Sequence, residues 1–407
     1  MDWKTMLVVH LVVGARVLLP LVIPRYPLWG ILACMILDSA DQSILEAFGV
    51  VFPRYQSYDK ALDIYYLAVA YLATMRNWEN LAAFQVGRVL FYLRLLGVLA
   101  FELTEARWLL FVFPNAFEAF FVYYEIVRRR GNPRLLTRNA LLVVVAVIWF
   151  VLKLPHEWWV HIAKLDATDF VKTHILGAPP STSFWRAIIE APAVTGSLTL
   201  IAAILALAAW HFAKKRKRRT ALNRTLHGAT ANDAGSLLST TDSDVAAVSA
   251  GRARRTLRVS LFRYQAAFGL RVGVLVEKVA LVSAVSVIFG QILPGMEANG
   301  IRTAFFVSLT VVIGDFLLRW TLRRFMILVG TWVDVSMMAV LNFFFVLLFQ
   351  FIIPYAPRHN LAPALIFASL ITLFVALYDG CRPIYDVREA DTQVAKRGAS
   401  APSARGY

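Results

Sequence analysis

The chain has 407 residues, of which 59% are hydrophobic and only 17% are charged, and its formal net charge is +16. Water-soluble domains contain about 25% charged residues, so this composition leaves too little polar surface for a soluble globule. The positive charge is concentrated in clusters beside apolar runs, which is typical of cytoplasmic flanks that contact anionic lipids and not of a nucleic-acid-binding surface. These basic clusters are Arg128–Arg138, Lys214–Arg219, Arg252–Arg258 and Arg319–Arg324.

Eleven apolar stretches are long enough to cross a bilayer, which requires about 20 residues. They cover residues 6–24, 27–45, 61–77, 82–103, 108–127, 139–155, 192–213, 266–293, 303–320, 327–354 and 360–378. The second stretch is the weakest, because Asp38 and Asp41 interrupt it, and counts of ten or twelve also fit the pattern. The sequence therefore predicts an all-α, polytopic bundle of about 11 transmembrane helices without a soluble domain.

A polar linker divides these spans into two groups. Residues 1–213 form a predicted seven-span half, and residues 259–380 form a four-span half. The linker at 214–258 is flanked by basic clusters and is otherwise rich in small and polar residues, so it buries too little apolar area to offset the entropy of ordering. We expect the linker to be disordered and cytoplasmic, and we expect the same of the tail at 381–407.

The distribution of positive charge predicts an orientation in the membrane, because basic loops stay in the cytoplasm. We expect this membrane to be the plasma membrane. Eleven spans then place the N-terminus outside and the C-terminus inside. Residues 156–176 fall outside the cell in this arrangement. Glu157, His161 and Lys164 recur there with helical spacing beside a pair of tryptophans. This pattern predicts an external helix that lies in the membrane interface.

Ionisable residues inside the spans are candidates for a polar cavity, because a charge at membrane depth is costly without a partner or water. Lys278 and Asp315 lie on successive spans, which predicts an ion pair, whereas the adjacent Glu277 points about 100° away and needs its own partner. The same residues are also explained as structural pairs that fix helix packing. The ionisable residues inside the spans are Arg16 and the polar-cavity candidates Arg88, Arg94, Glu118, Glu277, Lys278, Asp315 and Asp334.

Four aspartates form a second constellation at the ends of two neighbouring spans. Asp38 and Asp41 are three residues apart, and Asp59 and Asp63 are four apart, so each pair shares a helix face. Carboxylate oxygens of this kind hold Mg²⁺ and similar hard cations. The alternative is a set of solvated acids whose counter-charges are Lys60 and Arg54.

The spacing of these aspartates resembles that of the CDP-alcohol phosphotransferase family, over about 26 residues. The resemblance implies that Asp38, Asp41 and Asp59 bind a divalent cation such as Mg²⁺ and that Asp63 is the catalytic general base. The chain departs from the family pattern at its glycine and alanine–arginine positions. Gln42 and Tyr55 replace the two glycines, and Leu45-Glu46 replaces the alanine–arginine pair. An acid in place of the arginine repels phosphate, which weakens this interpretation.

Three classes of function remain open. The pattern of buried charges favours transport of a solute or ion through a polar cavity. The alternatives are a membrane-embedded, metal-dependent enzyme for a lipid or lipid-linked substrate, and a structural partner in a membrane complex. The two cysteines have no metal-type spacing, and the sequence contains no Walker A motif or dinucleotide fingerprint. We therefore expect no nucleotide-binding domain in this chain and no cofactor beyond a divalent cation.

Overall fold

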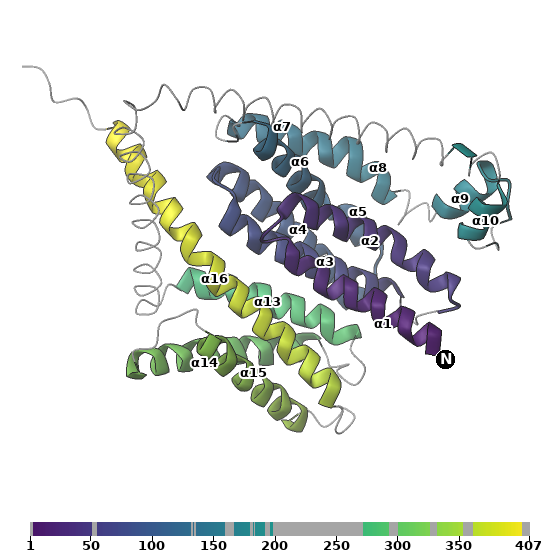
Figure 1. The fold of residues 1–407 in the computed structure, drawn as a ribbon. Helices are drawn as coiled ribbons and strands as arrows, with labels where there is room; N and C mark the ends of the chain where they lie inside the picture. Colours follow the sequence, from purple (N-terminus) through teal and green to yellow (C-terminus); the bar gives the residue numbers. More distant parts are fainter. Residues whose placement is uncertain are drawn as a thin grey trace, which may run out of the picture. The chain divides into compact units, whose positions relative to one another are not determined.

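The described part of the chain consists of helices joined by turns, and no strand occurs within it (Figure 1). This computed structural model describes residues 3–50, 55–131, 133, 136–158, 167–179, 182, 184–191, 196–197, 272–292, 300–325, 332–352 and 361–400. The all-α fold class predicted from the sequence is confirmed for these residues. The predicted linker at 214–258 lies outside them, as does almost all of the predicted span at 192–213.

Seven of the described helical stretches are long and apolar enough to cross a membrane. Several of them join two or more of the elements labelled in Figure 1. Two of the seven stretches are single helices, Pro27–Ala47 (α2) and Val272–Ile292 (α13), and two are parts of longer helices, Gly300–Leu317 of α14 (Gly300–Phe325) and Pro363–Gln393 of α16 (Leu361–Ser400). Trp3–Val22 consists of α1 (Trp3–Leu18) and the 3₁₀ turn η1 (Leu19–Val22), and Trp108–Arg130 consists of α5 (Trp108–Val112) and α6 (Ala116–Arg130). Arg138–Glu157 consists of α7 (Arg138–Val147), a π-helical turn η3 (Ile148–Lys153) and α8 (Leu154–Glu157).

Three further helices coincide with predicted spans but are not among these seven. They are α3 (Tyr55–Asn77), α4 (Leu81–Thr104) and α15 (Trp332–Ile352). Within α15, the segment Ser336–Leu348 is apolar but shorter than a span. Each of the three helices as a whole has the length of a span, at 23, 24 and 21 residues. The count of about 11 spans therefore stays a prediction.

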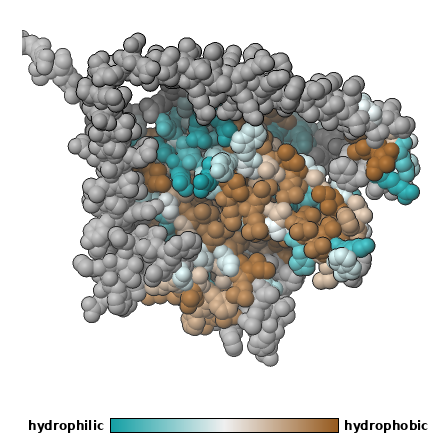
Figure 2. Space-filling model, in the orientation of Figure 1, coloured by the Kyte–Doolittle hydropathy of each residue, from teal (hydrophilic) through white to brown (hydrophobic). Residues whose placement is uncertain are grey.

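Helix α3 lies at the centre of the bundle and packs against α2, α4, α13 and α16. Every residue from Ala61 to Met75 is buried. A helix that is buried on all sides belongs to the core of a bundle. Large apolar side chains instead lie exposed on the outer helices, among them Trp29, Phe150 and Phe305. Figure 2 shows hydrophobic side chains over much of the described surface, with hydrophilic ones gathered toward the top of the view.

Local sequence explains several helix boundaries. Pro27 opens α2, where its missing N–H costs no hydrogen bond. The Asn80 side chain caps α4 by accepting a hydrogen bond from the Ala83 N–H at 3.1 Å, and Thr137 caps α7 in the same way through Ala140 at 3.3 Å. The helix that includes α5 and α6 is interrupted at Phe113–Asn115, where Pro114 cannot donate a backbone hydrogen bond.

The last helix differs from the expectation for the C-terminus. The sequence predicts a disordered tail from residue 381, whereas α16 continues as helix to Ser400. Tyr385, Asp386 and Val387 are buried there. Arg388 also donates hydrogen bonds to the backbone carbonyls of Trp78 and Arg76 at the end of α3, so polar residues that look solvated in the sequence hold this segment in the bundle.

Residues Leu165–Arg258 form a separate unit, of which α9 (Ala167–His174) and α10 (Phe184–Glu190) are the described helices. These two helices pack against each other. The interfacial helix predicted at 156–176 spans the boundary of this unit. Residues 156–158 continue the α7–α8 stretch and 167–174 form α9, while 159–166 lie outside the described residues.

Candidate polar site in the helix bundle

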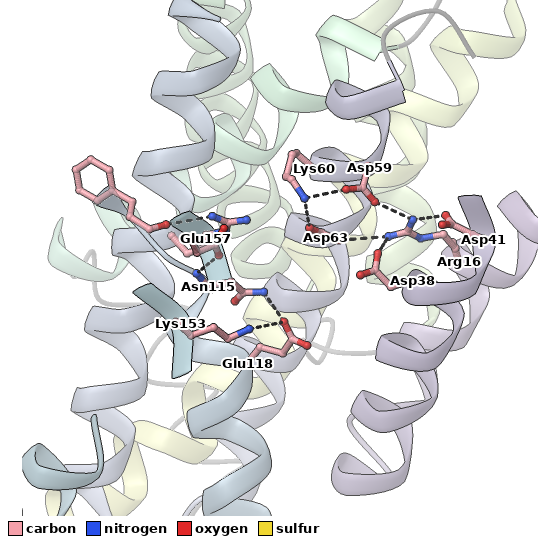
Figure 3. A network of polar contacts seen from close by, with 12 residues as sticks. Arg16, Asp38, Asp41, Asp59, Lys60, Asp63, Asn115, Glu118, Lys153 and Glu157 are labelled. Carbon is pink, nitrogen blue, oxygen red and sulfur yellow. Dashed lines mark hydrogen bonds and ion pairs between the residues drawn. The ribbon is translucent and has the colours of Figure 1, made fainter. Parts of the chain in front are cut away.

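Arg16 of α1 is surrounded by the four aspartates of α2 and α3 (Figure 3). Its guanidinium donates hydrogen bonds to Asp38 and Asp41, and it lies 3.2 Å from Asp59 and 3.3 Å from Asp63. Arg16 is 5% exposed, so this charge is buried and depends on its acidic partners. We call these five residues, with Lys60, the aspartate cluster.

Lys60 adds a second cation on the α3 side of the cluster. Its ammonium group lies 2.8 Å from Asp59 and 3.2 Å from Asp63. Asp41 and Asp63 are buried, while Asp38 and Asp59 are partly exposed. Within the cluster, the carboxylates outnumber the cationic side chains by two. Such an excess of negative charge favours the binding of a cation.

Three of the four aspartates are close enough to share a metal ion. One carboxylate oxygen each from Asp38, Asp59 and Asp63 lies within 4.8 Å of the other two. All the donors are carboxylate oxygens, which suit Mg²⁺ or Ca²⁺. The resemblance instead implies Asp41 as the third ligand and Asp63 as the base. In the structure, Asp63 joins the group of potential ligands, and Asp41 contacts Arg16.

A second polar group, the α4–α6 group, lies beside the aspartate cluster (Figure 3). Glu118 accepts a hydrogen bond from the Asn115 side chain and lies 4.0 Å from the Lys153 ammonium group. The Asn115 N–H donates to Glu157 at 3.2 Å. Arg94 donates to the carbonyl oxygen of Phe113 at 3.1 Å. Among the described residues, Lys153 is the cation that pairs with Glu118.

A third group, the α13–α16 network, connects the C-terminal helices. Lys278 is buried between Asp315, at 2.9 Å, and Asp379, at 2.8 Å. The predicted pair of Lys278 and Asp315 is therefore confirmed. The adjacent Glu277 has partners of its own, as expected, because it accepts hydrogen bonds from Tyr71 at 2.5 Å and from Arg382.

The remaining candidates from the sequence lie elsewhere. Arg88 is exposed on α4, and the side chain of Asp334 lies outside the described residues. Sequence reasoning missed the role of Arg16 in the aspartate cluster, and it also missed Lys153, Asp379 and Arg382. The available indication for Arg16 was its position inside an apolar span, which requires an acidic partner from a neighbouring helix.

Together, the fold and these three groups define an all-helical membrane protein with ionic networks buried between its helices. Comparisons with protein families, with curated proteins and with solved structures find no match for this chain. The geometry of the buried polar groups is therefore the observation from which a function can be inferred.

Proposed function

We propose that this chain is a membrane-embedded enzyme that binds a divalent cation such as Mg²⁺ and acts on a lipid or lipid-linked substrate that carries phosphate. The observation that supports this proposal is the convergence of four aspartates, from two helices, around the buried Arg16 side chain. Three of them offer oxygens within 4.8 Å of one another. The spacing of the same residues in the sequence resembles that of a family with this chemistry.

The aspartates have distinct roles in this proposal. Asp38 and Asp59 hold the cation, with Asp63 at the same point as a further ligand or as the general base. Arg16 and Lys60 lie 3.3 and 3.2 Å from Asp63 and keep its carboxylate directed into the cluster. Asp41 positions Arg16 from the other side. A bound divalent cation neutralises charge on a phosphate group and polarises it toward attack.

Metal binding tests this proposal directly. The full chain, purified in a neutral detergent, is expected to bind Mn²⁺ as a stand-in for Mg²⁺, measured by electron paramagnetic resonance. Asp59→Asn and Asp63→Asn each remove an anionic ligand, and each is expected to weaken binding by about tenfold or more. Glu190→Gln is the matched control, because Glu190 is exposed and pairs only with Arg186 among the described residues. Equal Mn²⁺ binding by all four proteins would refute the proposal.

We also propose a multi-pass arrangement in the plasma membrane, with the N-terminus outside, the C-terminus in the cytoplasm and the basic clusters on anionic lipids. The seven membrane-length helices support a membrane location. Single cysteines introduced at 176–190, in a chain whose Cys34 and Cys381 are replaced by serine, are expected to react with an impermeant thiol reagent on intact cells. Labelling only after lysis would contradict this orientation.

Transport of an ion is a second candidate function, favoured by the α13–α16 network. Lys278 is shared by two carboxylates from different helices, so its pairing can change if the helices shift. For proton transport, proteoliposomes with an internal pH dye are expected to dissipate a pH gradient, and Asp315→Asn is expected to slow this process. Equal rates for empty liposomes and proteoliposomes would exclude proton transport.

A further inference from the structure

Arg94 is a buried cation in the middle of α4. It is 2% exposed, and its hydrogen bond to the Phe113 carbonyl is the one it makes among the described residues. Its Nε atom is buried and has no hydrogen-bond partner there, and no described carboxylate forms an ion pair with it. A guanidinium has five N–H donors, so this arrangement leaves much of its binding capacity unused.

The surroundings of Arg94 connect it to the aspartate cluster. Arg94 binds the Phe113 carbonyl, two residues before Asn115, which holds Glu118, and α4 packs against both α6 and α3, the helix of Lys60 and Asp63. Lys60 is itself a member of the cluster, through its contacts of 2.8 and 3.2 Å with Asp59 and Asp63. Lys60 thus belongs to α3, the helix that packs against the helix of Arg94, and Figure 3 shows it on the metal ligands Asp59 and Asp63.

We propose that Arg94 and Lys60 form an oxyanion subsite that takes the phosphate group of the substrate beside the aspartate cluster. This inference rests on the proposed function and identifies the part of the site that binds the substrate. A guanidinium presents a planar pair of donors that matches two phosphate oxygens, and a buried position removes competing water. Glu118 is held by Asn115 and Lys153, which leaves Arg94 available to a ligand.

The order of binding follows from the charges. The aspartate cluster carries more carboxylates than cations, so it repels a phosphate group that approaches alone. A divalent cation on the aspartates removes this repulsion and supplies a further contact for the phosphate oxygens. Phosphate binding at Arg94 is therefore expected to require the divalent cation.

The experiment measures phosphate binding by the full chain in neutral detergent, with Mg²⁺ or with EDTA. The two probes are a short-chain phosphatidic acid, which represents a lipid phosphate, and ADP, which represents a soluble phosphate. With Mg²⁺, Arg94→Gln is expected to weaken binding of the preferred probe by about tenfold or more. Arg94→Lys keeps the charge and is expected to fall between Arg94→Gln and the wild type. Arg88→Gln, an exposed arginine on the same helix, is expected to bind as the wild type does.

The outcomes separate this inference from the proposed function. Mn²⁺ binding without measurable binding of either probe would overturn the inference and leave the metal site intact. Binding that Arg94→Gln and Arg94→Lys do not change would also overturn it. Phosphate binding that depends on Arg94 in a chain without metal binding would support the subsite, but it would contradict the expected order of binding and refute the metal-dependent enzyme. Reaction of a thiol dye with buried Cys34 and Cys381 checks that each variant is folded.

Discussion

Arg16 connects three helices through one side chain. It extends from α1 to carboxylates on α2 and α3, and those carboxylates would repel one another without it. The removal of one partner from a buried ionic group costs far more than the loss of a surface ion pair. The stability of this corner of the bundle therefore depends on a cation among the aspartates, either the guanidinium or a metal ion.

Replacement of Arg16 tests this dependence. Arg16→Gln leaves the four aspartates with Lys60 as their cation within the cluster, and it is expected to lower the free energy of unfolding by about 3 kcal/mol or more. The measurement is the midpoint of thermal unfolding, followed by a dye that reacts with Cys34 and Cys381 as they become exposed. Mg²⁺ is expected to raise the midpoint more in this variant than in the wild type.

Arg25→Gln provides the control for that measurement. Arg25 is exposed in the turn between η1 and α2, and it contacts the Tyr26 ring. Its replacement is expected to change the midpoint little, because exposed cations contribute little to stability. An Arg16→Gln protein as stable as the control, with or without Mg²⁺, would show that the aspartates do not need a cation.

The sequence predicts that the four aspartates lie in two pairs, but it does not predict which cationic side chains form ion pairs with them. Helical spacing alone puts Asp38 with Asp41 and Asp59 with Asp63. The rotation of α1 about its axis, which directs Arg16 into the cluster, depends on packing against α2 and α3. No local pattern encodes that rotation, so the arginine appears in the sequence only as an interruption of an apolar run.

At the level of elements, the break between α5 and α6 has a direct role in the site. It leaves the Phe113 carbonyl outside a regular helix, where Arg94 donates a hydrogen bond to it. Gly97, one turn after Arg94 on α4, allows this close approach. A Cβ atom at Gly97 would lie 2.3 Å from the Cβ of Phe113, so no larger side chain fits without a shift of one helix.

Gly97→Ala is therefore expected to destabilise the protein by about 1–3 kcal/mol, because an added methyl group in a packed interface forces the backbones apart. The same thermal measurement detects this change. Gly14→Ala is the matched control, since nothing lies within 4 Å of its added Cβ. Alanine is the better helix former, so this control is expected to be as stable as the wild type or slightly more stable. A Gly97→Ala protein that matches the control would mean that α4 and Phe113 are less closely packed than described here.

The length of each apolar stretch predicts the positions of most helices. The ends of the helices differ from the prediction where polar residues are buried. Most of the predicted spans coincide with described helices, whereas the end of α16 does not follow hydropathy. Asp379 follows the predicted span at 360–378, and Arg382 and Asp386 fall in the predicted disordered tail, but each forms an ion pair in the structure. A hydropathy scale predicts that such charged residues are exposed to solvent, because it does not include the ion-pair partners that compensate for the cost of burying them.

At the level of the whole molecule, the two halves separated by the linker are joined through α3. This helix packs against α13 and α16 of the C-terminal half, and Tyr71 donates a hydrogen bond to Glu277 across that contact. Tyr65 also packs edge-to-face against Phe289 and Phe374. The interface combines apolar packing with buried polar pairs, so its stability does not depend on the linker.

Two separately expressed chains, residues 1–213 and 259–407, are therefore expected to associate in the membrane and to purify together. Arg388→Gln removes the hydrogen bonds from α16 to the carbonyls of Trp78 and Arg76 in the N-terminal half, and it is expected to reduce the yield of the complex severalfold. Arg302→Gln, at an exposed position of α14, is expected to leave the yield unchanged. Failure of the wild-type chains to associate would show that the linker is needed to join the halves.

The position of Arg16 also has a consequence for the biogenesis of the protein. Its partners Asp38 and Asp63 follow it by 22 and 47 residues, so they leave the ribosome later than α1 does. Until then, an arginine in the interior of an isolated span costs about 2.5–3.5 kcal/mol on insertion scales. Helix α1 gains its full stability in the lipid only after α2 and α3 arrive, which makes these three helices one unit of membrane insertion.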